Sequence, residues 1–400
     1  MRARSWILVV VGLLLAVAGA ARAGGFEVAE QSAAAGGTAG AATAREGDPG
    51  AAWYNPAALA DGGGLRVGLG LLAAMPSVSA SAMDGSWSAG SQNGPATPPH
   101  LHVSEARGRL AWGVAVGVPF GGGVSWPEDW QGRSEIISSQ LEVFRVAPFV
   151  AWNLGSVRVA GGLHADFGRL RLRRSLDFVD TEGDVRLDLD GRGYGVDLAC
   201  WWQARRDLAV GLSYKSRDTL GLHGGADFTA PDEFSAKTSD QHVGAQMHLP
   251  DRIGLGAAWR HGALLALADL EVVTWSVNQE LVLDFENEAT PDVVQANRWR
   301  TTVGLRTGVE WTAKGGTWLR GGAFYDPSPA QAKTLAPSSP DANRLGVTLG
   351  AGRRLRRDLT LDGFYEYMQL LGRQTESMDS LQARYSGHAH LLGLDLRYVR

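Results

Sequence analysis

Two histidine pairs have the residue type and spacing that could bind a metal ion. His100 and His102 form one His-x-His pair, and His388 and His390 form a second. Side chains alternate across a β-strand, so both members of a pair would share a face and could hold a metal ion together. No cysteine or acidic residue completes either pair at metal-ligand spacing. We therefore interpret these histidines as strand-face or turn residues, and we expect no metal and no cofactor.

Catalytic motifs are absent from the sequence. The chain has no G-x-S-x-G nucleophile elbow, no P-loop and no H-E-x-x-H zinc motif. Its one cysteine, Cys200, lies in an alternating apolar run, which indicates a small packed residue rather than a catalytic thiol. A Ser/His/Asp set could be assembled from distant residues, but no motif marks one. The sequence thus predicts that this protein is not an enzyme, and a hydrolase is the weakest alternative.

A group of large apolar residues is a better candidate for binding chemistry. Trp126, Trp130, Ile136 and Ile137 lie close together in a segment that follows an alternating run. They could form an outer groove that captures a hydrophobic ligand, since exposed apolar patches tend to bind something. The two tryptophans fit equally well as anchors at a membrane interface.

Alternating runs must position these residues, and such runs dominate the sequence after residue 64. In one of them, Leu110, Trp112, Val114 and Val116 share a face, while small residues occupy the other face. A period of two is the signature of a strand with one apolar side. The chain contains 14 such runs. They lie near residues 64–75, 99–108, 109–119, 140–154, 156–174, 183–203, 207–222, 243–260, 263–277, 297–312, 317–326, 343–355, 358–370 and 387–399.

The connections between the runs alternate in length. Even-to-odd connections are tight turns such as Arg107-Gly108-Arg109, whereas odd-to-even connections are long, such as residues 120–139 and 327–342. Short turns at one end, long loops at the other and an even strand number are typical of outer-membrane barrels. After residue 23 no uncharged apolar stretch of 18 residues exists, so no transmembrane helix is predicted. The pattern predicts an all-β fold, a 14-stranded antiparallel transmembrane β-barrel in the outer membrane of a Gram-negative bacterium.

Two kinds of residue interrupt the runs. The apolar parity changes at Gly191 and Gly193, which is consistent with a β-bulge. Pro148 and Pro250 lie within strand runs, where proline cannot donate to the hydrogen-bond ladder. We expect the wall to be kinked or locally unpaired at both prolines.

The first 63 residues differ from the rest of the chain. Residues 1–23 combine Arg2 and Arg4, an uncharged apolar run and an Ala-x-Ala site, which predicts a signal peptide cleaved after Ala23. Residues 24–63 are rich in alanine and glycine and do not alternate. They could form a flexible linker or a compact plug in the barrel lumen, and the Trp-Tyr-Asn-Pro cluster at their end favours the plug. We therefore divide the chain into a signal peptide (1–23), a plug (24–63) and a barrel (64–400).

Short motifs stand along the chain in a fixed order. Near the start are Gly25-Phe26, Glu30-Gln31-Ser32, Asp48 and Asn55-Pro56-Ala57. Further along are the stretches "GVPFGGGVSWPEDWQGR", "LPDRIGLGAAWR" and "YDPSPA". Together they resemble the FadL/TodX family of outer-membrane transporters of hydrophobic compounds, over the whole chain that follows the signal peptide.

The resemblance implies a function as well as a fold. It implies a plugged 14-stranded barrel that admits long-chain fatty acids or aromatic hydrocarbons. The ligand would be captured outside and pass to an apolar pocket near Phe26. A shift of the plug, which carries the motif Asn55, Pro56 and Ala57, would then let it leave sideways through a gap in the barrel wall. No basic residue here can be matched to those that bind a fatty-acid carboxylate in the family, so the ligand stays open.

Further partners follow from the same pattern. We expect contacts with outer-membrane lipid and detergent-like molecules and with the outer-membrane assembly machinery, and a monomeric barrel. The C-terminal Arg400 departs from the usual aromatic end and bears on recognition by that machinery. A formal net charge of −4 argues against a nucleic-acid partner. The main alternative function is a structural or adhesive barrel that binds a surface partner through its long loops.

Overall fold

The computed structural model describes residues 25–178, 181–377 and 380–400. The predicted signal peptide therefore lies outside the described residues. None of the helices in this part is long and apolar enough to cross a membrane. The helices are α2 (Ala33–Gly36), α3 (Ala51–Tyr54), η1 (Pro56–Leu59), η2 (Asp232–Phe234), η3 (Trp275–Val277) and η4 (Ala332–Thr334). The strands are β1 (Gly64–Ser81), β2 (Ser88–Gly90), β3 (Pro99–Arg107), β4 (Leu110–Ser125), β5 (Ser138–Asn153), β6 (Val157–Phe178), β7 (Thr181–Arg205), β8 (Leu208–Lys215), β9 (Asp218–Thr229), β10 (Gln241–Leu249), β11 (Arg252–His261), β12 (Leu264–Val273), β13 (Glu280–Phe285), β14 (Val293–Ala296), β15 (Thr302–Ala313), β16 (Thr317–Asp326), β17 (Arg344–Arg354), β18 (Leu359–Gln374) and β19 (Arg384–Val399).

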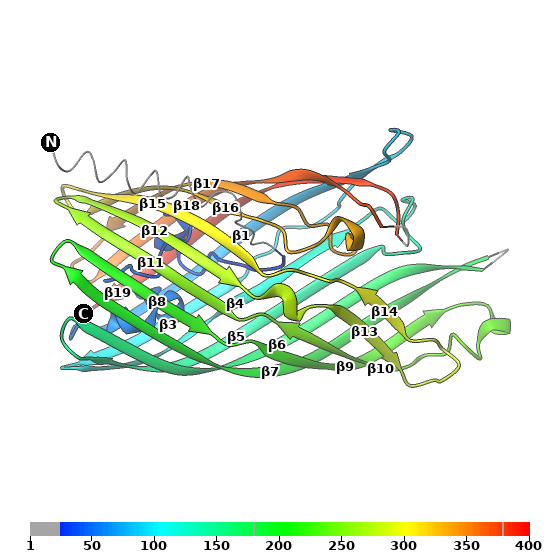
Figure 1. The fold of residues 1–400 in the computed structure, drawn as a ribbon, viewed down its shortest axis with the longest axis horizontal. Helices are drawn as coiled ribbons and strands as arrows, with labels where there is room; N and C mark the ends of the chain where they lie inside the picture. The colour runs from blue at the N-terminus through cyan, green and yellow to red at the C-terminus, as the bar shows by residue number, and fades with distance from the viewer. Residues whose placement is uncertain (1–24, 179–180, 378–379) are drawn as a thin grey trace.

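The strands form one closed antiparallel sheet, seen from its side in Figure 1. Closure comes from β1, which pairs with β19 on one side and with β3 on the other. β2 is a short addition beside the end of β1. Four strands are each divided into two segments, namely β8 with β9, β10 with β11, β12 with β13 and β14 with β15. The described residues thus form a barrel of 14 strands, which confirms the predicted fold.

Connection length distinguishes the two ends of the barrel. The turns β3–β4 and β11–β12 have only two residues between strands, and Gly108 and Gly262 there adopt φ of 60° and 58°. Glycine tolerates this left-handed conformation, which tight hairpins require. The other end carries the long loops and the protruding hairpin of β6 and β7 (Figure 1). We call the part of the barrel next to the two-residue turns the turn half, and the part next to the long loops the loop half.

The apolar side chains change sides between these halves. On β6, Leu163 and Phe167 in the turn half are 63% and 48% exposed, whereas Leu170 in the loop half is 3% exposed. On β7, Leu187 and Leu189 are likewise buried. In the turn half the apolar face points outward, as expected for contact with lipid, and in the loop half it points into the lumen.

This reversal corrects one expectation. β7 keeps a continuous register with β6 through Gly191 and Gly193, so no bulge lies between these two strands. The parity changes because the apolar face belongs to the lumen before these glycines and to the outer surface after them.

Both prolines interrupt the wall, as predicted. The pairing of β5 with β6 omits Pro148, which lies between the paired residues Val146 and Phe149. Pro250 lies in the break between β10 and β11. Each position lacks a backbone donor, so the ladder cannot run through it unbroken.

Candidate functional site

The segment before β1 lies inside the turn half of the barrel. Residues 29–45 and 55–60 are buried, and α2, α3 and η1 contact different parts of the surrounding wall (Figure 1). α2 packs on β17, β18 and β19, α3 on β3 and β4, and η1 on β5, β6 and β7. Because this segment touches wall strands on several sides, it fills the lumen there.

Small side chains make that packing possible. A β-carbon at Gly36 would lie 2.6 Å from the ring of Phe364. The close approach of α2 to β18 therefore requires a glycine at position 36. On the wall side, a β-carbon at Gly211 would lie 2.0 Å from the carbonyl oxygen of Thr43. The alanine and glycine content of the segment is thus explained by close contact with the wall rather than by flexibility.

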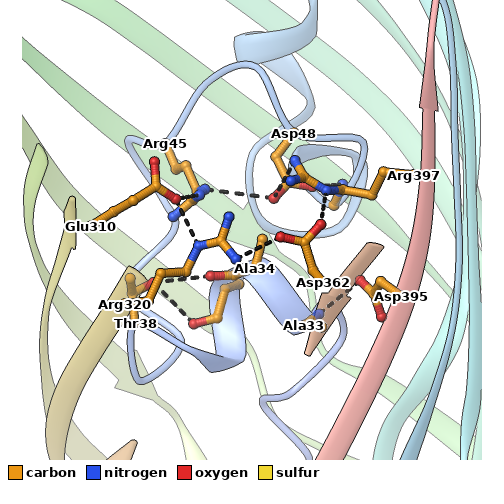
Figure 2. Close-up of polar contacts among 12 residues, drawn as sticks. Ala33, Ala34, Thr38, Arg45, Asp48, Glu310, Arg320, Asp362, Asp395 and Arg397 are labelled. Atoms are coloured by element: carbon orange, nitrogen blue, oxygen red, sulfur yellow. Dashed lines mark hydrogen bonds and ion pairs between the residues drawn. The ribbon is translucent and has the colours of Figure 1, made fainter. Parts of the chain in front are cut away.

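Six charged side chains join the segment to the wall, as Figure 2 shows. Glu310 accepts from Arg45 and Arg320, with an Arg320 Nε–Glu310 Oε2 distance of 2.7 Å. Asp362 accepts from Arg320 at 2.6 Å and also from Arg397. Asp48 closes the circuit, with Oδ2 3.8 Å from Arg397 and 3.6 Å from Arg45. We call this set the charge ring: Arg45, Asp48, Glu310, Arg320, Asp362 and Arg397.

The charge ring is balanced and buried. It alternates three guanidinium groups with three carboxylates, so no charge is left over. Burial alone would raise the pKa of Asp48, but Arg397 and Arg45 lower it below its ordinary value. Ion pairs removed from water are costly to break by removing one member, because the partner is left uncompensated. The ring therefore holds the segment firmly while every member is present.

Wall carboxylates also accept hydrogen bonds from the backbone of the segment. Asp395 accepts from the amide of Ala33 at 2.7 Å, where α2 begins. Asp269 accepts from the amides of Ala42 and Thr43 at 2.9 and 2.8 Å. These bonds satisfy backbone donors that a buried, irregular segment would otherwise leave without partners.

The motif Asn55, Pro56 and Ala57 lies at the end of the segment and is fully buried. Asn55 Oδ1 accepts from the amide of Ala57 at 3.1 Å and so caps η1, and Pro56 stands at the first position of that turn. The Asn55 amide donates to the carbonyls of Thr43 and Cys200, at 2.8 and 2.9 Å. One side chain thus joins the turn, the preceding segment and wall strand β7.

Aromatic rings surround Phe26, which lies on the side of the charge ring that faces the loop half. Its ring centroid lies 4.8 Å from Trp275, 5.3 Å from Trp299 and 6.0 Å from Phe120. Trp275 comes from η3, which interrupts one wall strand, and Phe120 from β4. We call these four residues the aromatic cluster, in which Phe26 occupies the space between the other three rings.

The predicted capture residues extend this apolar region. Trp126 and Trp130 stack at 4.8 Å and belong, with Ile136, to the same buried core as Phe120, Trp275 and Trp299. Their indole groups donate to the carbonyls of Pro337 and Ile136. The tryptophans are only 2% and 4% exposed, so they form neither an exposed patch nor membrane anchors. Ile137 is also buried but lies outside this core.

The wall is interrupted beside Phe26. The β3–β4 ladder ends at Leu101↔Val116, and the register of β4 with β5 shifts between Gly117 and Phe120. The N-terminal segment takes over there as a pairing partner. The amide of Val28 donates to the carbonyl of Pro119 at 3.0 Å, and that of Gly121 donates to the carbonyl of Phe26 at 2.8 Å.

One basic residue of the loop half has no partner. Arg174 of β6 is in register with Val185, on the face that points into the lumen, and is partly buried. No hydrogen bond or ion pair of Arg174 exists among the described residues, whereas its neighbour Arg173 pairs with Asp184 and Glu128. Sequence reasoning missed Arg174 because four arginines stand within residues 169–174 and only the fold shows which side each one faces.

These features define a class of protein: an outer-membrane barrel whose lumen is closed by its own N-terminal segment. The chain belongs to the outer membrane protein transport protein family (OMPP1/FadL/TodX), whose model matches residues 14–399. An outer membrane protein of Neisseria meningitidis serogroup B is 25% identical, over 96% of this chain and 97% of the relative.

Solved structures of similar fold agree with this assignment. A Pseudomonas aeruginosa FadL homologue superposes with a TM-score of 0.84 at 19% identity, covering 94% of this chain and 99% of the other. The toluene transporter TodX of Pseudomonas putida gives a TM-score of 0.77 at 17% identity, covering 95% and 99%. The Ralstonia pickettii toluene transporter TbuX gives 0.71 at 19% identity, covering 92% and 98%. At these identities the likeness concerns the fold.

Proposed function

We propose that this protein carries long-chain fatty acids or related hydrocarbons passively across the outer membrane. Captured ligand enters past Trp126, Trp130, Ile136 and Ile137 and reaches the aromatic cluster around Phe26. Movement of the plug then releases it sideways through the wall. The observation that carries the proposal is the continuous apolar core that joins Trp126, Trp130 and Ile136 to Phe26, on the loop side of the plug and the charge ring.

The distribution of polarity supports a sideways route. An apolar molecule gains roughly 25 cal/mol for each Å² of surface removed from water, so it is held well by the loop half. On the turn side of Phe26 the lumen is filled by the plug and the charge ring, and the apolar side chains there are already packed between plug and wall. A ligand that leaves the aromatic cluster toward lipid therefore keeps its apolar surroundings, whereas one that moves down the lumen loses them.

The interrupted part of β4 is the exit that this route needs. Beyond Val116 no ladder joins β4 to β3, and the plug supplies the pairing at Pro119 and Gly121 instead. Displacing residues 26–28 from β4 would at the same time remove Phe26 from the aromatic cluster and free the unpaired edge of the wall. Entry of the ligand into the aromatic cluster and opening of the wall are in this way coupled to one short segment.

Arg174 favours a fatty acid over a neutral hydrocarbon as ligand. It is a lumen-facing guanidinium without an acidic partner, flanked by Leu172 and Leu176, which pack against the apolar core. A carboxylate on an apolar chain would supply the missing partner through a charge-assisted hydrogen bond. Toluene, which the similar TodX and TbuX structures are named for transporting, has no such group.

A disulfide across the junction tests the coupling. Glu27 and Phe120 form a bridge between the plug and β4, and their Cα atoms should lie about 4.5 Å apart, as in non-hydrogen-bonded antiparallel pairs. In the variant C200S/E27C/F120C, oxidation should stop the uptake of fatty acid into proteoliposomes, and reduction should restore it. The variants C200S/E27C and C200S/F120C should respond to neither treatment. Uptake that continues with the disulfide closed would refute plug movement at β4.

A further inference from the structure

A second group of chemically active side chains lies on the lumen face of the wall, apart from the charge ring. His164 and Asp166 belong to β6, and Asp218 begins β9. One ligand atom from each lies within 4.8 Å of the others. All three side chains are completely shielded from solvent.

The histidine is oriented by a neighbouring carboxylate. His164 Nδ1 lies 2.8 Å from Asp197 Oδ1. An ionised carboxylate only accepts, so the ring proton is on Nδ1, and the Nε2 lone pair of the neutral ring is free. Nε2 is directed toward Asp218, with a separation of 3.8 Å from Oδ2. A carboxylate that fixes a histidine in this way is the usual second layer of a metal site.

Asp218 is the unusual member of the group. Both of its carboxylate oxygens, together with His164 Nε2, are buried and receive no hydrogen bond from an amide, hydroxyl or guanidinium donor among the described residues; the polar group beside Asp218 is the carboxyl group of Asp166. Asp166, by contrast, is held by Arg145 through two bonds of 2.7 and 2.6 Å. An ionised carboxylate shielded from water is very costly unless a cation or a proton compensates it.

The intervening strand β7 is shaped to let these side chains meet. Gly195 is in register with His164, and Gly193 with Asp166. A β-carbon at Gly195 would lie 2.3 Å from His164 Nε2, and one at Gly193 would lie 2.9 Å from Asp218 Oδ2. Any larger residue would therefore occupy the space in which side chains from β6 and β9 converge.

We propose that His164, Asp166 and Asp218 bind one divalent transition-metal ion of the zinc class. An imidazole nitrogen with two carboxylates suits such an ion, and bonds of about 2.0–2.2 Å permit donor separations up to roughly 4.4 Å. Small movements of the side chains bring the present donors into that range. The ion neutralises Asp218, while Arg145 and Lys215 offset the charges of Asp166 and Asp197. His164 and Asp166 are two positions apart on β6, but the third ligand, Asp218, lies on β9, so no local motif marks this site.

Zinc retention by the purified barrel tests the proposal. Protein in detergent is stripped with EDTA, incubated with ZnCl₂ and desalted, and bound metal is measured by mass spectrometry. The wild type should retain about one Zn²⁺ per chain more than D218N, since three protein ligands make one site. D197N, which changes only the orienting carboxylate, should weaken retention about 10- to 100-fold.

H100Q is the matched control. His100 Nε2 lies 2.8 Å from Asp395 Oδ1 in the same lumen, and both are buried, but within residues 25–178, 181–377 and 380–400 no third His, Cys, Asp or Glu completes that pair as a metal site. H100Q should keep the zinc of the wild type. Equal retention by the wild type and D218N would overturn the proposal and assign a proton to His164 and Asp218.

A second experiment uses Co²⁺ and the wild-type protein alone. It decides the question if D218N fails to assemble, which loss of heat-modifiable migration in gel electrophoresis would show. Wild-type protein loaded with Co²⁺ should show a visible d–d absorption band that EDTA removes, because protein ligands create an asymmetric field around the ion. A wild-type barrel without such a band would overturn the proposal.

Discussion

The two halves of the barrel use the same alternating sequence in opposite ways. In the turn half, apolar residues such as Leu163 face outward, and the lumen holds the plug and the charge ring. In the loop half, apolar residues such as Leu170 and Leu189 face inward and join one core with Trp275. The interior of the turn half is thus held by paired charges and hydrogen bonds together with a core of mostly small side chains around Trp53 and Leu59, and that of the loop half by removal of large apolar side chains from water.

The difference bears on the proposed function. An apolar interior with a few polar groups suits a hydrophobic ligand, whereas the interior of the turn half is occupied by the plug and its charge ring. The segment around Phe26 lies at the boundary and belongs to both halves. In the turn half it is anchored through Arg45 and Asp48 of the charge ring, and toward the loop half it ends with Phe26 among aromatic rings. Substitutions in the turn half should therefore change hydrogen exchange in the plug, and substitutions in the loop half should change ligand affinity.

The largest effect should come from breaking the charge ring. D362N removes the carboxylate that pairs with both Arg320 and Arg397 and leaves two buried guanidinium groups short of a partner. Loss of one member of a buried ion pair costs about 3–5 kcal/mol. We expect plug docking to weaken by that amount, seen as faster amide hydrogen exchange in residues 29–60.

The control for this prediction is an ion pair outside the lumen. Asp188 pairs with Arg169 at 2.5 Å, and both side chains are more than 40% exposed. D188N should leave exchange in the plug unchanged, because exposed pairs contribute little. Equal exchange in D362N and the wild type would show that the ring does not hold the plug.

A smaller effect, confined to the loop half, should follow from R174M. Removing the guanidinium eliminates a charge-assisted hydrogen bond to a bound carboxylate, worth about 1.5–3 kcal/mol, which is roughly a 10- to 100-fold loss of fatty-acid affinity. Binding of toluene should not change. Fluorescence quenching of the loop-half tryptophans, or calorimetry, measures both ligands.

The neighbouring arginine provides the matched comparison. Arg171 lies on the same strand but on the outer face, where its side chain is 41% exposed and approaches Asp188. R171M should bind both ligands like the wild type. If R174M retains full affinity for the fatty acid, the carboxylate is bound elsewhere, and the preference for an acid loses its support.

Local patterns made the barrel predictable from the sequence. Alternation and the parity of turn lengths are properties of adjacent residues, so the 14 strands and the interruptions at Pro148 and Pro250 could be predicted. Alternation does not say which face meets lipid, so a reversal of the apolar face, as at Gly191, has the same sequence signature as a bulge. Trp126 and Trp130 were expected to be exposed, because burial under a folded loop leaves no local signal.

The candidate site depended on contacts between distant residues. Arg45 and Glu310 are 265 positions apart and become partners only when the plug enters the barrel. The motif Asn55, Pro56 and Ala57 and the residue Phe26 could be selected through family resemblance. The wall groups that receive them, such as Asp395 and Trp275, could not be identified, since many wall residues of the same types are present.

Replacing Asn55 should have a moderate effect on the boundary between plug and wall. N55A removes the cap of η1 and leaves the carbonyls of Thr43 and Cys200 without this donor. An unsatisfied buried polar group costs about 1–3 kcal/mol. Exchange should accelerate most in residues 43–60. N287A, a loop substitution that removes two exposed hydrogen bonds to the backbone of Ala236 and Ala289, should not alter it.

The smallest effect concerns pH. Burial would raise the pKa of Asp48, but Arg397 and Arg45 hold it below its ordinary value near 3.8. A carboxyl group with a depressed pKa in the docked state stabilises that state fully above its ordinary pKa, and the contribution is lost as pH falls through the lower, docked-state pKa.

Hydrogen exchange in residues 45–53 should therefore be protected equally between pH 5 and 8, after correction for intrinsic rates. Protection should decline only below pH 4, and D48N should lack this acid-dependent step. A decline of the wild type between pH 5 and 7 would instead locate the titrating group outside the charge ring.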